Sequence, residues 1–193
     1  LTNMYADTYL KDFKNIAEYA NSAVVQYSTM IVSISQISET LFILTIPFFL
    51  KKFGIKKVML MSMFAWVIRF GFFSIGSPDG FGLILIIISN IVYGMAFDFF
   101  NISGSLFVET NTNSTIRSSA QGLFMMMTNG LGAISGSYLS GKIITAFFTN
   151  TEGIKDWSGI WLTFAVYALI ITVFFALMFK HKHNPKELGE VSH

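Results

Sequence analysis

The sequence contains no cysteine and only 3 prolines among its 193 residues. The lack of cysteine excludes a disulfide framework, a thiolate metal site and a cysteine nucleophile. The chain also lacks a phosphate-binding P-loop, a dinucleotide-binding glycine fingerprint and the HExxH pattern of zinc hydrolases. The histidines, His181, His183 and His193, lie in or near a charged tail without a coherent set of metal ligands. We therefore expect no metal, no cofactor and no enzyme active site.

Charged residues are scarce, at 12%, whereas hydrophobic residues make up 53% of the chain and phenylalanine contributes 21 residues. The mean hydropathy is +0.58. A chain of this length with so few charges is typical of a membrane protein rather than of an ordinary soluble domain. The lipid bilayer is therefore an expected partner, and no nucleic-acid partner is expected.

Long apolar runs divide the chain into segments of the length that an α-helix needs to cross a bilayer. The runs lack the alternation of apolar and polar residues that is typical of barrel strands, so we predict an all-α membrane protein. Residues 1–10 look like the last part of another span. The complete spans are expected at residues 24–50, 58–75, 83–108, 120–148 and 157–179.

The distribution of lysines predicts the orientation in the membrane. Basic residues favour the cytoplasmic side, and they crowd the connection at residues 51–57 and follow the last span. This pattern places the C-terminus in the cytoplasm and makes residues 180–193 a cytoplasmic tail. The lysines that carry the prediction are Lys51, Lys52, Lys56, Lys57, Lys180, Lys182 and Lys186.

Two acidic residues, Glu39 and Asp98, lie near the middle of apolar spans. An ionised carboxylate at that depth costs several kcal/mol, so such residues usually face a bundle interior or a water-filled cavity. They commonly mark the pathway of protons, ions or substrates. The alternative is that neighbouring helices satisfy both acids without any role in transport.

Polar side chains accompany each acid at helical spacing, which places each set on one helical stripe. We expect the two stripes to line a shared polar interior. The stripes are Ser28, Ser35, Gln36 and Glu39 in one span and Asn90, Tyr93, Gly94, Asp98, Asn101 and Ser105 in the other.

The remaining spans predict the surroundings of that interior. Spans 58–75 and 157–179 are almost wholly apolar and are expected to face lipid, with Arg69 as an interfacial anchor rather than a transport residue. In the span 120–148, Gly132, Gly136 and Ser140 form a ladder of small residues. Such a ladder favours close helix packing, with lining of a cavity as the alternative.

Three stretches resemble one known family closely. Residues 31–50, IVSISQISETLFILTIPFFL, are similar to the eighth helix of bacterial nucleoside/proton symporters of the major facilitator superfamily. Residues 93–105, YGMAFDFFNISGS, resemble their tenth helix, and residues 119–124 and 128–130 resemble the start of their eleventh. The similarity extends over essentially the whole chain.

The resemblance implies a specific architecture and activity. The family imports purine and pyrimidine nucleosides together with protons across the bacterial inner membrane. Residues 1–193 then correspond to the C-terminal six-helix half of a major facilitator fold, with part of helix seven followed by helices eight to twelve. Alternating access needs one half to rock against the other, so the N-terminal half is expected to be necessary for transport.

The resemblance also implies which residues contact the nucleoside. The matching positions are Asn3, Gln36, Glu39, Tyr93, Phe97 and Asp98. Their chemistry suits the ligand, because carboxylates accept hydroxyl hydrogens, amides donate and accept, and an aromatic pair one turn apart supplies a stacking wall.

The two acids have two candidate roles. Burial disfavours the ionised form, so either acid is a candidate proton carrier. Our hypothesis is that Asp98 couples proton uptake to substrate binding, while Glu39 mainly binds hydroxyl groups. Two other functions remain open: transport of another polar solute such as a sugar, and a noncatalytic membrane scaffold.

Overall fold

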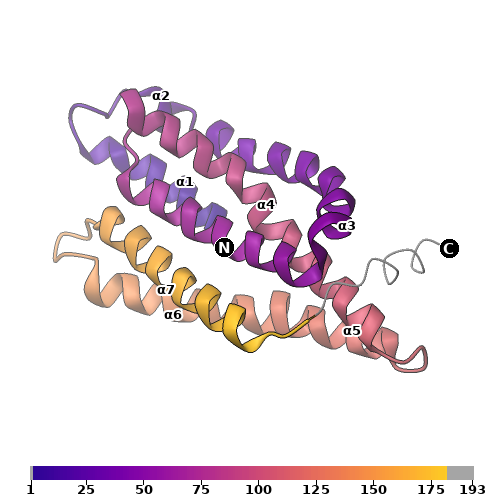
Figure 1. Ribbon diagram of the computed structural model, residues 1–193. Helices are drawn as coiled ribbons and strands as arrows, with labels where there is room; N and C mark the ends of the chain where they lie inside the picture. Colours follow the sequence, from indigo (N-terminus) through magenta and orange to yellow (C-terminus); the bar gives the residue numbers. More distant parts are fainter. Residues whose placement is uncertain (1, 182–193) are drawn as a thin grey trace.

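The computed structural model describes residues 2–181, which fold into a bundle of α-helices (Figure 1). A 3-10 turn spans Phe13–Asn15, and within the described residues the only strand-like feature is an isolated bridge between Thr149 and Lys155. The helices α3, α4 and α7 are each long and apolar enough to cross a membrane. The helices are α1 (Thr2–Asp12), α2 (Ala23–Gln26), α3 (Ser28–Ile75), α4 (Gly80–Asn111), α5 (Arg117–Met125), α6 (Gly132–Phe147) and α7 (Trp157–Met178).

Helix α3 contains two of the predicted spans, because the expected connection at residues 51–57 is a bend inside a helix rather than a loop. The backbone leaves the helical region at Gly54, whose φ is 77° and ψ is 166°. Figure 1 shows α3 turning back on itself. We call residues 28–53 the first limb and residues 55–75 the second limb. Pro47 lies within the first limb and does not end it.

We predict that Gly54→Ala destabilises the protein by about 1–3 kcal/mol, because a backbone with these angles is tolerated almost only by glycine. Thermal unfolding in detergent measures the effect. Gly122→Ala in α5 is the matched control, since a Cβ at Gly122 meets nothing within 4 Å. A melting temperature for Gly54→Ala equal to that of the control would contradict the prediction.

The second limb of α3 packs between α4 and α7, which corrects the expectation that span 58–75 mainly faces lipid. On the α7 side, Ser74 Oγ donates to the carbonyl of Ser158 at 3.1 Å, and Ser158 Oγ donates to the carbonyl of Ser74 at 2.8 Å. Nearby, the fully buried Trp161 stacks on Phe70 with ring centroids 5.8 Å apart. Most of the remaining surface of α7 is exposed, as expected for a span that faces lipid.

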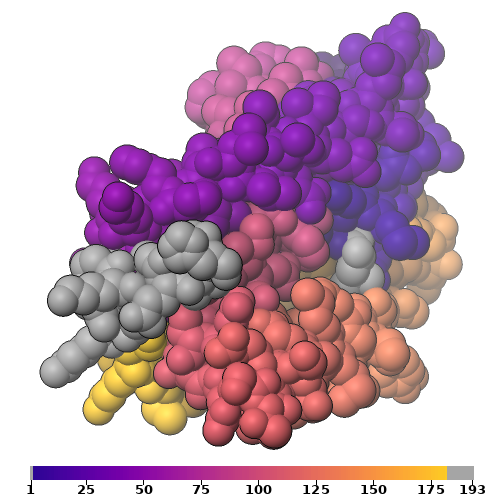
Figure 2. Space-filling view, turned by 90° about the vertical axis from the view of Figure 1, so that its right-hand side faces the viewer, coloured from indigo at the N-terminus to yellow at the C-terminus, as the bar shows by residue number. Residues whose placement is uncertain are grey.

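The predicted span 120–148 is built from α5, a π-helical segment at Met126–Leu131, and α6. In Figure 2 this segment forms the lower side of the molecule, while α3 and the start of α4 form the upper side. The contact of α5 with α4 includes a hydrogen bond from Gln121 Nε2 to the carbonyl of Ser105 at 2.7 Å. Arg117 and Glu109 form an ion pair with a nitrogen–oxygen distance of 4.0 Å.

The glycine ladder does not produce the close helix packing that was predicted. A Cβ placed on Gly136 would meet nothing within 4 Å, and one on Gly132 would meet only the carbonyl group of Met127 in its own helix. Gly136 instead lines a cavity of about 310 Å³ together with residues of α1, α3 and α7. Cavity lining, the alternative interpretation, therefore describes Gly136 better.

Candidate substrate site

The crossing of α3 and α4 brings the two acids into one region of the bundle. A Cβ on Gly94 of α4 would lie 2.6 Å from the backbone nitrogen of Glu39, so the two backbones are in direct contact at this point. Ser38 reinforces the crossing by donating a hydrogen bond to the carbonyl of Ile91. Glu39 therefore lies beside the turn of α4 that carries Tyr93 and Asp98.

Asp98 is the more enclosed of the two acids. Its exposed fraction is 7%, and its Oδ2 atom has no hydrogen-bond partner among the described residues. Glu39 is half-buried, and the two carboxyl groups are close enough to interact electrostatically. Asp98 is therefore shielded, whereas Glu39 remains partly exposed.

The rings of Tyr93 and Phe97, which lie one helical turn apart, stack on each other. Their ring centroids lie 5.9 Å apart, with an angle of 14° between the planes. The ring of Trp66, from the second limb of α3, meets Tyr93 edge-on at 5.7 Å. Phe97 is half-buried and immediately precedes Asp98 in the chain.

Asn3 joins this region from α1. Its Nδ2 donates to Ser35 Oγ of the first limb at 3.2 Å, and its Oδ1 accepts from Arg69 of the second limb at 2.9 Å. Gln36 follows Ser35 in the chain and is exposed one turn before Glu39. Gln36 is associated with the other candidate residues by its position in the chain.

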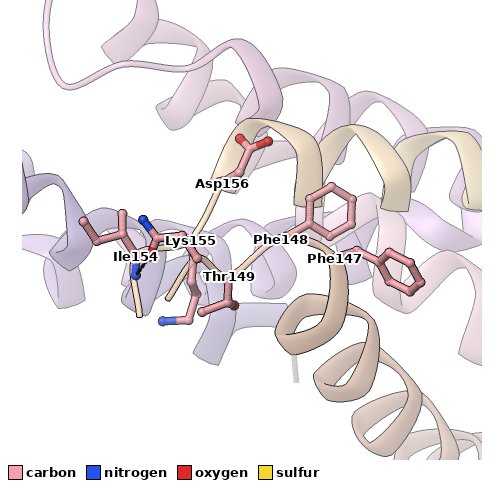
Figure 3. A pocket seen from close by; sticks show the side chains of 7 residues that line it. Phe147, Phe148, Thr149, Ile154, Lys155 and Asp156 are labelled. Carbon is pink, nitrogen blue, oxygen red and sulfur yellow. Dashed lines mark hydrogen bonds between the residues drawn. The ribbon is translucent and has the colours of Figure 1, made fainter. Parts of the chain in front are cut away.

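A separate cavity of about 370 Å³ lies at the connection between α6 and α7 (Figure 3). Phe147, Phe148 and Asp156 are among its lining residues, and Asn150 Oδ1 shapes the loop by accepting from the backbone nitrogen of Ile154 at 2.8 Å. None of the candidate substrate residues lines this cavity. The polar region between α1, α3 and α4 is therefore a different part of the fold.

Comparison with protein families identifies the family of the whole chain. Residues 1–184 match the family model described as nucleoside H+ symporter. The chain belongs to the nucleoside H+ symporter family. The resemblance inferred from the helix sequences is therefore confirmed.

Several curated relatives of this symporter chain share more than half of its residues. The xanthosine permease of Escherichia coli (strain K12) is 55% identical over 188 residues, which cover 97% of this chain and 44% of the permease. The nucleoside permease NupG of the same strain is 53% identical over 195 residues, which cover 100% of this chain and 46% of NupG. The chain thus spans less than half the length of these relatives. Both are permeases, which confirms the prediction that the chain is not an enzyme.

Solved structures of NupG share the fold of the symporter chain. One crystal structure, of a mutant of the nucleoside transporter NupG, superposes with a TM-score of 0.89 at 52% identity and covers 93% of this chain and 44% of that one. A second NupG crystal structure gives a TM-score of 0.88 at 53% identity, with 94% and 44% covered. These matches confirm the predicted all-α membrane fold of the major facilitator type.

Arg69 is the residue near the candidate substrate residues that the sequence interpretation placed wrongly. It was expected at the membrane interface, yet its exposed fraction is 0%. It contacts two of the candidate substrate residues, because its guanidinium lies 2.9 Å from Asn3 Oδ1 and 4.5 Å from the ring centroid of Tyr93. An arginine within an apolar span is itself a sign of function, and that signal was available in the sequence.

Proposed function

We propose that this chain is the C-terminal half of a transporter that imports nucleosides together with protons. Residues 1–193 then provide part of helix seven and helices eight to twelve of a major facilitator fold. The family match and the permeases named above support this proposal. The share of those permeases that the chain covers, 44% and 46%, is close to one six-helix half.

The observation that carries the proposal is the convergence of two acids, an amide and a stacked aromatic pair where α1, α3 and α4 meet. A nucleoside is uncharged and offers ribose hydroxyls, donors and acceptors on the base, and an aromatic face. Glu39 accepts hydrogen bonds from hydroxyl groups, Asn3 and Gln36 bind polar edges, and Tyr93 and Phe97 stack against the base. Asp98, which is shielded and whose Oδ2 has no partner among the described residues, takes up the proton.

The proposed setting is the bacterial inner membrane, with the lipid bilayer around the exposed apolar faces. The lysines at the bend of α3 and those after α7 then lie on the cytoplasmic side. The proposed cytoplasmic tail begins at residue 180, and residues 182–193 of it lie outside the described residues. Transport requires the N-terminal half as a partner, because alternating access rocks one half against the other.

The test uses this chain fused to the segment of NupG that it does not match, which we call the joined transporter. In vesicles with an inward proton gradient, we expect accumulation of labelled uridine that an uncoupler abolishes. Excess unlabelled adenosine should compete, since the family resemblance implies both purine and pyrimidine substrates, whereas glucose should not. The measurement is the initial rate and the plateau of uridine uptake.

Two outcomes would replace the proposal. Competition by sugars but not by adenosine would indicate a transporter of another polar solute. Absence of uptake by a correctly inserted joined transporter, while NupG itself is active in parallel vesicles, would indicate a membrane scaffold. In that case, neutralising Glu39 and Asp98 would leave partner binding unchanged.

A further inference from the structure

Arg69 is a fully buried cation without a carboxylate partner among the described residues. One guanidinium nitrogen donates to the carbonyl of Ser89 at 3.0 Å, and the other donates to Asn3 Oδ1 at 2.9 Å. Its Nε atom has no partner within the described part of the chain. Two aromatic rings enclose the guanidinium, since its carbon lies 5.0 Å from the ring centroid of Phe73 and 4.5 Å from that of Tyr93.

Burying an unpaired charge is costly, and packing alone is served as well by apolar residues. The contacts of Arg69 instead lead to two residues of the proposed substrate site. We infer that Arg69 is a positioning residue, which fixes the amide of Asn3 and the ring of Tyr93 in the orientation that binds the nucleoside. This inference rests on the proposed function.

The contact with Arg69 determines which way the Asn3 amide faces. Guanidinium has five donors and no acceptor, so the amide can present only its oxygen to Arg69. The nitrogen of Asn3 therefore faces the first limb and donates to Ser35 Oγ, which in turn donates to the carbonyl of Val32 at 2.6 Å. Every bond in this series has a consistent donor and acceptor.

Because its orientation is fixed, the Asn3 amide has a defined hydrogen-bonding capacity left for the substrate. One hydrogen of Asn3 Nδ2 is used by Ser35, and the other has no acceptor within the described part of the chain. Asn3 is therefore assigned to an acceptor on the nucleoside, such as a base carbonyl, a ring nitrogen or a ribose oxygen. Without Arg69 the amide is free to rotate and loses this selectivity for an acceptor.

Arg69 constrains Tyr93 in the same way. The guanidinium lies over the face of the Tyr93 ring, and a cation in this position is attracted to the ring electrons. Phe97 stacks nearly parallel to Tyr93, and Trp66 meets its edge. The Tyr93 ring is thus held by contacts from α3 and α4. The aromatic pair of Tyr93 and Phe97 therefore keeps its orientation in the absence of substrate.

A purely structural role for Arg69 predicts different behaviour. Arg69 also joins α3 to α4, because Ser89 Oγ donates to the carbonyl of Arg69 at 2.9 Å while Arg69 donates to the carbonyl of Ser89. A substitution that only weakened this junction would lower stability without selective loss of substrate affinity. The test therefore measures binding and stability side by side.

In the joined transporter, Arg69→Lys keeps the charge but has one ammonium group in place of the guanidinium fork. We expect the dissociation constant for uridine and the KM of uptake to rise about tenfold, the loss typical of one hydrogen bond to a charged group. The maximal rate should change by less than about twofold. Ser74→Ala is the matched control, since it removes a partly buried hydrogen bond of the same limb on the α7 side. Its affinity for uridine should equal that of the unsubstituted protein.

The double variant Asn3→Ala with Arg69→Lys tests whether Arg69 acts through Asn3. We expect it to bind uridine no more weakly than the weaker of the two single variants, because both remove the same oriented donor. Losses that multiply, or an Arg69→Lys affinity equal to that of the Ser74→Ala control, would overturn the inference.

Asn3→Asp keeps the inference testable if Arg69→Lys does not fold. Aspartate retains an oxygen for Arg69 but has no N–H to donate, so we expect a melting temperature at least equal to that of Asn3→Ala together with uridine binding about tenfold weaker than that of the unsubstituted protein. Equal destabilisation in both variants would contradict the contact with Arg69. Absence of uridine binding by the unsubstituted joined transporter would instead reject the proposed function.

Discussion

Replacing Asp98 with asparagine is expected to abolish the accumulation of uridine by the joined transporter. Asparagine has the same shape but cannot carry a proton. A gradient of one pH unit supplies about 1.4 kcal/mol per proton, which is enough for about tenfold accumulation. The unsubstituted protein should approach that plateau, whereas Asp98→Asn should reach only equal concentrations inside and outside. The measurement is the ratio of internal to external uridine at the plateau.

Glu39→Gln is the matched control for this prediction, because it neutralises the neighbouring acid while preserving size. We expect it to weaken uridine binding by about tenfold, since a hydroxyl group loses a charged acceptor, yet to retain accumulation at saturating uridine. Unchanged proton coupling in Asp98→Asn would overturn the assignment. Loss of coupling only in Glu39→Gln would exchange the roles of the two acids.

The sequence was informative where residue chemistry and periodicity act within one helix. The placement of Glu39 and Asp98 within apolar spans and the exposed apolar surface of α7 follow from hydropathy and from a period of 3.6 residues. The role of Tyr93 and Phe97 as a stacking pair came from the family resemblance. The resemblance to symporters identified the same region and added Asn3, which a reading of short polar stripes alone would have left out. The helical content and the family were therefore predictable.

The errors concern contacts between helices. Arg69 was assigned to the interface because a long basic side chain near the end of a span usually reaches water. Its true environment depends on Asn3, Ser89 and Tyr93, which are distant in sequence, and periodicity contains no information on such partners. Gly136 was assigned to close packing for a similar reason, although a small residue permits contact without supplying a neighbour.

The bend at Gly54 shows a further limit of what sequence patterns can predict. The cluster of lysines predicts where the chain reverses in the membrane, and the reversal does occur there. It does not reveal that a single glycine makes the reversal, because the same charges are compatible with a loop of several residues. Backbone angles, rather than composition, distinguish the two.

The second large effect is expected for Gly94→Ala. A Cβ at this position would lie 2.6 Å from the backbone of Ser38 and Glu39, and neither backbone can move aside as a flexible side chain would. The first limb of α3 must therefore separate from α4, which costs about 1–3 kcal/mol for overpacking of this kind. The separation also moves Glu39 away from Tyr93 and Asp98. We expect a lower melting temperature together with at least tenfold weaker uridine binding in the joined transporter.

Gly71→Ala provides the matched control, because Gly71 lies within the second limb of α3 and a Cβ there meets nothing within 4 Å. Alanine at an unobstructed helical position stabilises by about 0.4–1 kcal/mol, since it restricts the unfolded chain. The two substitutions are chemically identical, so opposite signs of their effect on the melting temperature isolate the contribution of the crossing. If Gly94→Ala behaved like Gly71→Ala in both stability and uridine affinity, the backbone contact between α3 and α4 would not be what brings the two acids together.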